Sequence, residues 1–475
     1  MIALTLFEKI WNQHVVSNLD DGWVLLHVDR HLVHDLNGVP TLTELTERNL
    51  PVFSPELTFA TADHVVSSKP GRTGNTYEGG RKLYDGLRKS SGEHQIRFFD
   101  IGQPGQGIVH VMAPEMGVVL PGLTVICGDS HTCTNGGLGA LAFGVGSTEV
   151  THVLATQTIR QQKPKSMRIL CEGVLSEGVT AKDLALHILK TIGSSAGVGY
   201  AIEYAGEAIR ALEVESRLTL CNLSVELGAR CGIIAPDETT ISWLRDRPFA
   251  PALESFETAA ADWRALYSDE QAEFDCEVTI NACSVKPTIT WGTSPDQAID
   301  IDSTVPDPDR VSETLRSSYI TALNYMGLEP NQPIAGTQVD WVFIGSCANS
   351  RLTDLRAAAA VIRGRRISPS VTAWVVPGSE LTRRAAEAEG LREIFESAGF
   401  QWREPGCSMC VAANGDQVPP GKRSVSTSNR NFVGRQGPNA RTHLASPEMA
   451  AAAALTGRIV DVRKILALST ADISI

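Results

Sequence analysis

The strongest constraint on the fold is a repeated order of apolar run, short turn and helix in the last third of the chain. Residues 339–344 form an apolar run typical of a buried strand, and a helix pattern follows over 352–363. Residues 371–376 repeat the apolar run and lead through Pro-Gly-Ser at 377–379 into a second helical stretch. Buried strands alternating with helices predict an α/β fold with a parallel sheet.

Cysteines follow the strands of this repeat. Cys347 comes just after the first predicted strand, and Cys407 and Cys410 form a C-x-x-C pair after a short strand expected near residues 400–403. Ligands bind at the carboxyl ends of strands in such sheets, so we expect the three thiols to converge. Three thiolates are one short of a full set for zinc or an iron–sulfur cube. A four-iron cluster held this way keeps one iron open to act as a Lewis acid.

Two other interpretations of the C-x-x-C pair remain open on the pair alone, a redox dithiol or half of a zinc site. Zinc would need a second pair or a nearby H-x-x-x-H, and a thioredoxin-like dithiol should open a helix near the start of a chain. Neither context is found around residues 407–410. A three-cysteine structural metal site is a further alternative.

Several separate motifs resemble the aconitase superfamily. They are Gly-Ser-Cys-Ala-Asn-Ser-Arg at 345–351, Pro-Gly-Cys-Ser-Met-Cys at 405–410 and Ser-Asn-Arg-Asn-Phe-Val-Gly-Arg at 428–435. Asp-Arg-His-Leu-Val-His-Asp at 29–35 and Gly-Ile-Val-His-Val-Met at 107–112 are similar to the large subunits of bacterial 3-isopropylmalate dehydratases. The resemblance implies three α/β/α domains, at 1–163, 164–288 and 289–475, arranged around a [4Fe-4S] cluster, with the swivel domain absent.

The resemblance also implies one [4Fe-4S] cluster per subunit, with Cys347, Cys407 and Cys410 as its ligands. It places a set of acid–base residues in the active site, where loss of a hydroxyl as water needs a proton. These are Asp63, His64, His110, Asp129, Ser130 and His131. Taken alone, Asp63 and His64 need not pair, because adjacent side chains on a strand point to opposite faces, and the plainer interpretation of the two is a surface turn. His31 and His34 fall three apart and read as ordinary hydrogen-bonded histidines.

Two more groups are predicted to meet the substrate. Asn222 and Glu226 lie four apart and would share a helix face, which by itself is typical of a solvated edge. The resemblance moves them to the cluster, Asn222 orienting substrate and Glu226 contacting the iron-bound water. Asn429, Arg430 and Arg435 lie in a polar, Gly-rich stretch after the thiols, and the arginines suit paired hydrogen bonds to substrate carboxylates.

A dinucleotide-binding motif is excluded. Gly137 to Ala142 matches G-x-G-x-x-A, but the predicted strand 123–127 ends ten residues too early, and Gln157 and Gln161 occupy the window where an acidic residue belongs. The glycines are better explained by close backbone packing around residues 129–131.

Composition narrows the possible partners. Hydrophobic side chains make up 43% of the chain and charged side chains 20%, which is typical of globular proteins. The length of 475 residues suggests two to four domains. A net charge of −12 without basic clusters argues against nucleic acid and membrane-surface partners. Ten scattered cysteines, no signal peptide and no membrane span predict a reducing cytoplasm, and the other seven cysteines are expected to be small buried side chains.

The resulting hypothesis is a hydro-lyase that moves a hydroxyl between adjacent carbons, interconverting 2- and 3-isopropylmalate in leucine biosynthesis. In the family the base is a serine on a mobile domain, which isopropylmalate dehydratases carry on a separate small subunit, so we expect a heterodimer that is inactive without its partner. Ala348, Asn135 and Glu380 depart from the usual Thr, His and Gly, so another alkylmalate, homocitrate or citraconate stays an alternative substrate. A regulator that binds RNA when iron is lost is the alternative from a different class, and an isoelectric point of about 5.5 speaks against it.

Overall fold

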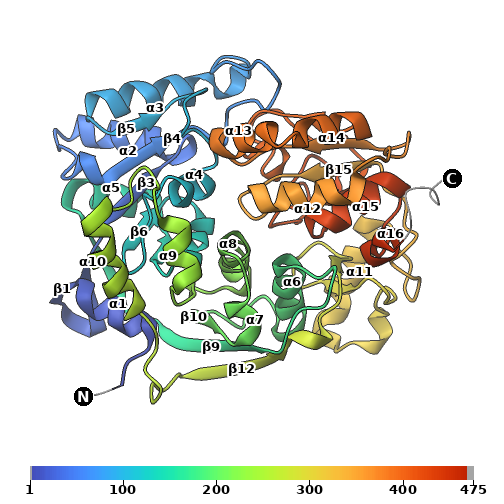
Figure 1. Ribbon diagram of the computed structural model, residues 1–475, viewed down its shortest axis with the longest axis horizontal. Coiled ribbons are helices and arrows are strands. Elements are labelled where there is room, and N and C mark those ends of the chain that lie inside the picture. The colour runs from blue at the N-terminus through green and yellow to red at the C-terminus, as the bar shows by residue number, and fades with distance from the viewer. Residues whose placement is uncertain (1–2, 468–475) are drawn as a thin grey trace. The chain divides into compact units, whose positions relative to one another are not determined.

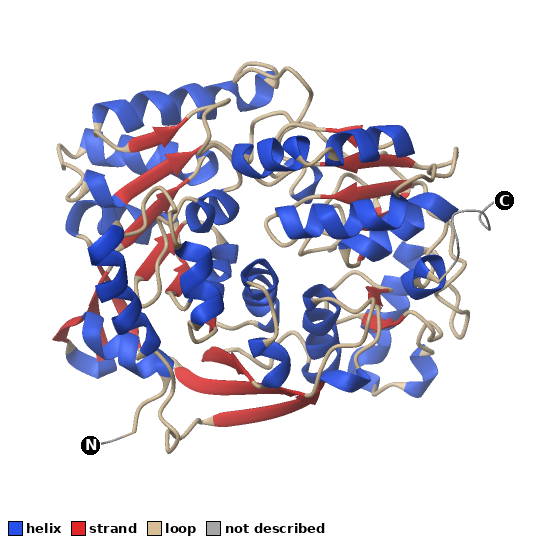
Figure 2. Ribbon diagram, in the orientation of Figure 1, coloured by secondary structure: helices blue, strands red, loops and turns tan. Residues whose placement is uncertain are grey.

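The computed structural model describes residues 3–467 and divides the chain into two compact units. Of the described residues, the first unit contains 3–66, 74–174 and 195–282, and the second contains 67–73, 175–194 and 283–467. Figures 1 and 2 show the helices and strands of both units. The predicted α/β class is confirmed, and the finer division into three domains stays a prediction.

The first unit contains two parallel sheets and one small antiparallel sheet. One parallel sheet has the order β5-β4-β3-β6-β7, the other β11-β10-β9-β12, and the antiparallel sheet β1-β2-β8. The strands are β1 (Val15–Asn18), β2 (Trp23–His27), β3 (Arg30–Val33), β4 (Thr58–Thr61), β5 (Arg97–Phe99), β6 (Thr124–Cys127), β7 (Leu141–Gly144), β8 (Thr158–Gln162), β9 (Lys165–Glu172), β10 (Tyr200–Ala205), β11 (Cys231–Ile233) and β12 (Cys276–Asn281).

Helices of the first unit cover its sheets. They are α1 (Leu6–His14), α2 (Asp35–Glu47), α3 (Arg81–Glu93), α4 (Val109–Glu115), α5 (Ser147–Thr156), α7 (Glu207–Arg210), α8 (Val214–Asn222), α9 (Glu238–Leu244) and α10 (Leu253–Arg264), with 3₁₀ helices that include η4 (Ser130–Leu138) and η5 (Leu223–Leu227). One core cluster joins Val33 of β3 and Ala60 of β4 to Leu42, Leu87 and Leu154 of the helices α2, α3 and α5. This core fixes the strand ends from which the polar residues of the unit emerge.

The second unit is built on one parallel sheet, in the order β17-β16-β15-β18-β19, beside the β13-β14 hairpin. Its strands are β13 (Thr288–Thr290), β14 (Ala298–Asp300), β15 (Trp341–Ile344), β16 (Thr372–Val375), β17 (Gln401–Trp402), β18 (Arg423–Ser426) and β19 (Arg441–Leu444). Its helices are α6 (Ala181–Ile192), α11 (Glu313–Met326), α12 (Leu352–Ile362), α13 (Glu380–Ala388), α14 (Leu391–Ala398), α15 (Pro447–Thr456) and α16 (Val462–Leu466), with the 3₁₀ turn η8 (Ser408–Cys410).

Alternation along β15 separates the two faces of this sheet. Val342 and Ile344 join the core formed with α12, α14 and α15, which lie beside the sheet in Figure 1. Phe343 belongs to a second cluster on the other face, with Met409 and Val418 from the loops after β17. Since successive side chains of a strand point to opposite faces, one strand supports both the helical layer and the cysteine loop.

Local sequence signals explain several element boundaries. Thr5 and Glu8 form a capping box at the start of α1. Thr180 caps the start of α6, and Gly193, with a positive φ of 87°, follows its last residue Ile192. The seven cysteines other than Cys347, Cys407 and Cys410 are expected from the sequence to be buried. Five of them are buried, but Cys276 is partly exposed and Cys283 is exposed. Within residues 3–467, no helix has the length and apolar character needed to cross a membrane.

Candidate active site

Three neighbouring parallel strands of the first unit end in polar residues. Strand β3 lies between β4 and β6, and His34 and Asp35 follow β3 directly. Asp63 and His64 follow β4, and Asp129 follows β6. The carboxyl ends of parallel strands lie at one edge of a sheet, which explains why residues far apart in sequence meet here.

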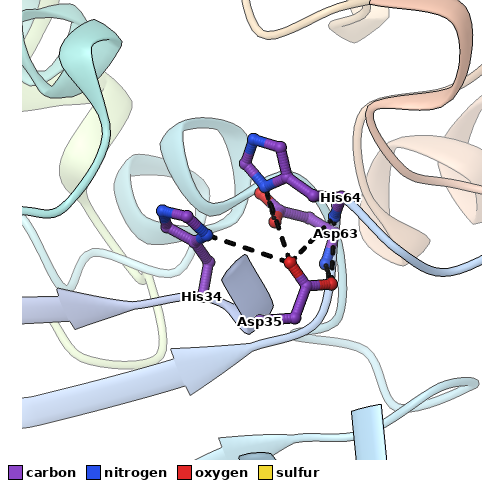
Figure 3. A group of neighbouring side chains, drawn as sticks. All are labelled: His34, Asp35, Asp63 and His64. Atoms are coloured by element: carbon purple, nitrogen blue, oxygen red, sulfur yellow. Dashed lines mark hydrogen bonds and ion pairs between the residues drawn. The ribbon is translucent and has the colours of Figure 1, made fainter. Parts of the chain in front are cut away.

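Asp35 organises the backbone of this edge. Its carboxylate oxygens accept hydrogen bonds from the backbone N–H groups of Asp63 at 3.1 Å, His64 at 3.1 Å and Val65 at 3.0 Å. Figure 3 shows this carboxylate among the neighbouring side chains. Because buried backbone donors need acceptors, Asp35 fixes the turn after β4. The sequence analysis assigned Asp35 no role, although its place at the start of a helix directly after a strand was a usable signal.

Asp63 and His64 form a buried pair. The Nδ1 atom of His64 lies 2.6 Å from Oδ1 of Asp63, and the other carboxylate oxygen accepts from the N–H of Val109 at 2.9 Å. Burial by itself would raise the pKa of Asp63, but the charge and hydrogen bond of His64 lower it. The expectation of a surface turn with diverging side chains is wrong, because both residues lie beyond the end of β4 and strand alternation no longer applies.

His34 completes the group drawn in Figure 3. Its ring packs against that of His64 at a centroid distance of 4.5 Å with a tilt of 35°, and its Nδ1 lies 3.8 Å from Asp35. Burial and the charge of His64 would lower the pKa of His34, yet bonds to Asp35 and Cys127 raise it to about 10. The ligand atoms of these four residues lie within 4.8 Å, a spacing that suits a metal ion. Their carboxylate oxygens already accept from backbone N–H groups and His64, so we interpret the group as a hydrogen-bonded cluster.

A second set of acid–base groups surrounds Asp129. Its Oδ1 accepts from the backbone N–H of His131 at 2.7 Å and lies 3.2 Å from Nε2 of His110, and its Oδ2 lies 3.6 Å from Nε2 of His64. Burial would raise the pKa of Asp129, but these three histidines hold it well below its usual value. Burial lowers the pKa of His110 despite the opposing effect of Asp129. The first unit therefore keeps an ionised carboxylate against several imidazoles.

His131 and Glu226 form a third imidazole–carboxylate pair, with Nε2 and Oε1 3.0 Å apart. Asn222 lies four residues before Glu226, but the two residues do not share one helix as expected. Helix α8 ends at Asn222, and Glu226 belongs to the following 3₁₀ helix η5. The side-chain amide of Asn222 donates to Thr134 at 2.7 Å, which joins it to η4, the segment that also carries His131.

Ser130 and Asn135 occupy the two halves of η4. Ser130 is partly exposed and lines a cavity of about 310 Å³ together with Arg230. Asn135 is buried, and its amide nitrogen lies 3.5 Å from Nδ1 of His110 and donates to the carbonyl of Thr132 at 3.0 Å. Asn135, which replaces the histidine usual at this position in the family, is therefore in direct contact with His110, one of the predicted acid–base residues.

In the second unit, the cysteines follow strand ends as expected. Cys347 lies three residues beyond β15, and Cys407 and Cys410 bracket the turn η8, closed by a bond from the N–H of Cys410 to the carbonyl of Cys407 at 3.0 Å. None of the three forms a disulfide within the described residues, and 7%, 7% and 5% of Cys347, Cys407 and Cys410 are exposed. They are accessible enough to bind a group and too buried to be ordinary surface thiols.

Asn429 links the two cysteine loops. Its Nδ2 donates to Sγ of Cys347 at 3.2 Å, and its Oδ1 accepts from Sγ of Cys410 at 3.5 Å. One carboxamide therefore contacts a sulfur from each loop, which brings thiols 63 residues apart in sequence to one place. Soft thiolate donors gathered in this way fit an iron–sulfur group.

Both cysteine loops contain backbone in the left-handed region. Ser346, just before Cys347, has φ 84°, and Ser408, just after Cys407, has φ 48°. Such conformations cost free energy for a non-glycine residue and persist only where the surroundings hold them. Asp416 holds the second loop, accepting from Ser408 at 3.0 Å and from Ser68 at 2.6 Å. Sequence patterns gave no sign of Asp416, because its partners lie far apart along the chain.

Arg430 and Arg435 lie in the irregular segment after Asn429, as the polar composition predicted, and both are partly exposed. The guanidinium of Arg435 lies 5.4 Å from the ring of Phe432. Its buried Nε has no hydrogen-bond partner among the described residues. A buried unpaired donor of a cationic side chain suits an anionic ligand.

Known proteins resemble the chain closely. A model of the aconitase family (aconitate hydratase) matches residues 8–457. The chain is 62% identical over 460 residues to the 3-isopropylmalate dehydratase large subunit 1 of Bradyrhizobium diazoefficiens, covering 97% of this chain and 96% of that protein. The crystal structure of Thermococcus kodakaraensis aconitase X in its holo-form aligns with 90% of this chain and 89% of its own at 12% identity, with a TM-score of 0.46, too low to carry an argument.

Proposed function

Because the chain belongs to the aconitase family, we propose that it is the large, cluster-binding subunit of a 3-isopropylmalate dehydratase. It would interconvert 2- and 3-isopropylmalate by removing and returning water, a hydro-lyase step of leucine biosynthesis. The observation that supports this most is the contact of one amide, that of Asn429, with the thiols of both cysteine loops. An enzyme that depends on three reduced cysteines belongs in the cytoplasm, where thiols stay reduced.

Cys347, Cys407 and Cys410 would hold one [4Fe-4S] cluster. When bound, such a group supplies a Lewis acid that makes a hydroxyl a better leaving group. The donor set fits it, since three soft sulfur ligands leave one iron without a protein thiolate. In the metal-free chain Asn429 hydrogen-bonds two of these sulfurs, and its N–H donation to Cys347 would remain once the thiols become thiolate ligands.

The substrate is a small dicarboxylate and needs cationic partners. Arg430 and Arg435 are suited to that role because a guanidinium can donate two parallel hydrogen bonds to a carboxylate. The buried Nε of Arg435 is a donor available for this purpose. Asn222, held by Thr134, would orient the substrate from the first unit.

Three imidazole–carboxylate pairs would manage the proton that leaves with water. They are His64 with Asp63, His110 with Asp129, and His131 with Glu226. In each pair the carboxylate contacts one ring nitrogen and orients the imidazole. The second nitrogen of His64 and that of His131 face Asp129, and that of His110 faces the amide of Asn135. Ser130, at the start of η4, is a further polar group near Asp129 and His131.

The name of the Bradyrhizobium protein, a large subunit, implies a small subunit as partner. We propose that this partner carries the swivel domain and the base that removes the proton next to a carboxylate, giving a heterodimer. The hypothesis of an RNA-binding regulator receives no support from the acid–base pairs, which RNA binding does not require.

The test is anaerobic reconstitution of the full chain with iron and sulfide, followed by a substrate panel with and without a small subunit. The expected result is four irons and four sulfides per chain and hydratase activity on 3-isopropylmalate only with the partner present. Stoichiometric zinc without visible charge-transfer absorption would refute the cluster. Full turnover without a partner would refute the heterodimer. Faster turnover of homocitrate or citraconate would reassign the substrate, as Asn135, Ala348 and Glu380 allow.

A further inference from the structure

Lys182 is an unusual residue in the second unit. It lies in the first turn of α6, two residues after the cap Thr180, and only 1% of it is exposed. A lysine is almost never fully buried without partners, and the positive end of the helix dipole disfavours a cation in the first turn. A buried cation at such a position therefore requires specific acceptors that offset both costs.

Its acceptors are two consecutive backbone carbonyls. The Nζ atom donates to the carbonyl of Ser428 at 2.6 Å and to that of Thr427 at 3.2 Å, about 245 residues further along the chain. Hydrogen bonds from a charged donor are about twice as strong as neutral ones. Lys182 therefore clamps the peptide that leads directly into Asn429 and Arg430.

The clamped segment also holds the cysteine loops. The hydroxyl of Thr427 donates to the carbonyl of Gly345 at 2.8 Å and accepts from the backbone N–H of Gly345 at 2.9 Å. Gly345 lies two residues before Cys347. Asn429 contacts the thiols of Cys347 and Cys410. Residues 427–429 thus connect a buried cation to both loops that carry the sulfur ligands.

The two carbonyls that Lys182 binds lie outside the hydrogen-bond ladder of the sheet. Strand β18 ends at Ser426, so the carbonyls of Thr427 and Ser428 lie beyond its ladder. Both residues are fully buried. A buried carbonyl that loses its donor is left unsatisfied, which is unfavourable, so the segment would move to find another partner.

We propose that Lys182 is a positioning residue that fixes residues 427–430, and so sets the orientation of Asn429 and Arg430 toward sulfur ligand and substrate. The substrate side of this role rests on the proposed function. The placement of the segment does not, so the two can be tested separately.

Lys182→Met tests the placement, because it keeps an unbranched apolar stem and removes the donor. Hydrogen–deuterium exchange of the metal-free full chain is followed at the amides of residues 427–431. We expect exchange at least tenfold faster in the variant, with the rest of β15 and β18 unchanged. Lys190→Met is the matched control: Lys190 lies on the same helix and pairs with Asp300, and its loss should leave residues 427–431 unaffected.

Activity of the reconstituted enzyme with its partner then tests the consequence. Lys182→Met should raise KM about tenfold or more with a smaller change in kcat, since it misplaces a substrate-binding arginine, and Lys182→Arg should recover part of the loss. If Lys182→Met does not fold, Lys182→Gln is measured in the same way. Unchanged exchange at 427–431 would overturn the clamp. Faster exchange with unchanged KM would overturn the orienting role, whereas inactivity of the wild-type enzyme would count against the proposed function alone.

Discussion

The two polar regions of this protein are assembled by different means. In the first unit, every carboxylate of the acid–base cluster is met by donors: Asp35 by three backbone N–H groups, Asp63 by His64 and Val109, and Asp129 by three histidines. In the second unit, soft thiols lie on loops with left-handed serines, and one amide contacts two of them. The carboxylates of the first unit are thus satisfied by donors of the chain itself, whereas the thiols of the second unit lie on strained loops that one amide links.

The largest expected effect lies in the thiol region. Changing Cys347, Cys407 or Cys410 to Ser should lower activity by about 100-fold or more, because a sulfur ligand of the cluster is lost. Iron, sulfide and visible absorbance measured after reconstitution should fall together. Cys283→Ser, at an exposed thiol, is the control and should retain full cluster content. A Cys347→Ser protein that holds a full cluster and stays active would show that Cys347 is not a required ligand.

The next effect lies in the acid–base region. Asp63→Asn removes the carboxylate that holds Nδ1 of His64 and should lower kcat about 10²-fold or more while leaving cluster content unchanged. The pH dependence of kcat should change as well, since the imidazole loses its charged partner. Asp85→Asn, which removes only an exposed ion pair with Arg81, should leave kcat within twofold. Loss of iron from Asp63→Asn would show that the two regions are not independent.

The pH dependence of the unfolding free energy tests the charge pairing at Asp129 in the first unit. Asp129 has a lowered pKa in the folded chain, so its ionised form stabilises the fold above about pH 4, and that stabilisation disappears as the pH falls further. Asp129→Asn should therefore cost about 2 kcal/mol of unfolding free energy at pH 7, and the cost should shrink below pH 4. Urea unfolding of both proteins from pH 3 to 7 measures this. A penalty independent of pH would contradict the charge pairing.

An effect of the opposite sign is expected at Glu448 in the second unit. Its Oε2 is buried and has no hydrogen-bond partner among residues 3–467, and burial raises its pKa to about 8. The folded chain therefore prefers the protonated form, and stability is lost as the pH rises from about 4.3 to 8. Glu448→Gln should relieve this by up to about 1.4 kcal/mol per pH unit over that interval, and thermal melts at pH 5 and 8 would show it. An equal shift at both pH values would contradict the interpretation.

The sequence by itself determined the local parts of this protein. The capping box at Thr5, the start and stop of α6, and the placement of Cys347 and Cys410 after strands all follow from signals within a few residues. Local hydrogen bonding and side-chain periodicity set these features, so they could be predicted without knowing the rest of the chain.

Only the tertiary structure decided how those parts meet. The pairing of Asp63 with His64, the anchoring of a turn by Asp35, and the clamp from Lys182 depend on which strand ends lie side by side and on backbone beyond regular elements. A lysine in a helix start reads as a solvated charge until the fold places two carbonyls against it. Sequence distance carries no information about such contacts, because they are fixed by packing of segments up to 245 residues apart.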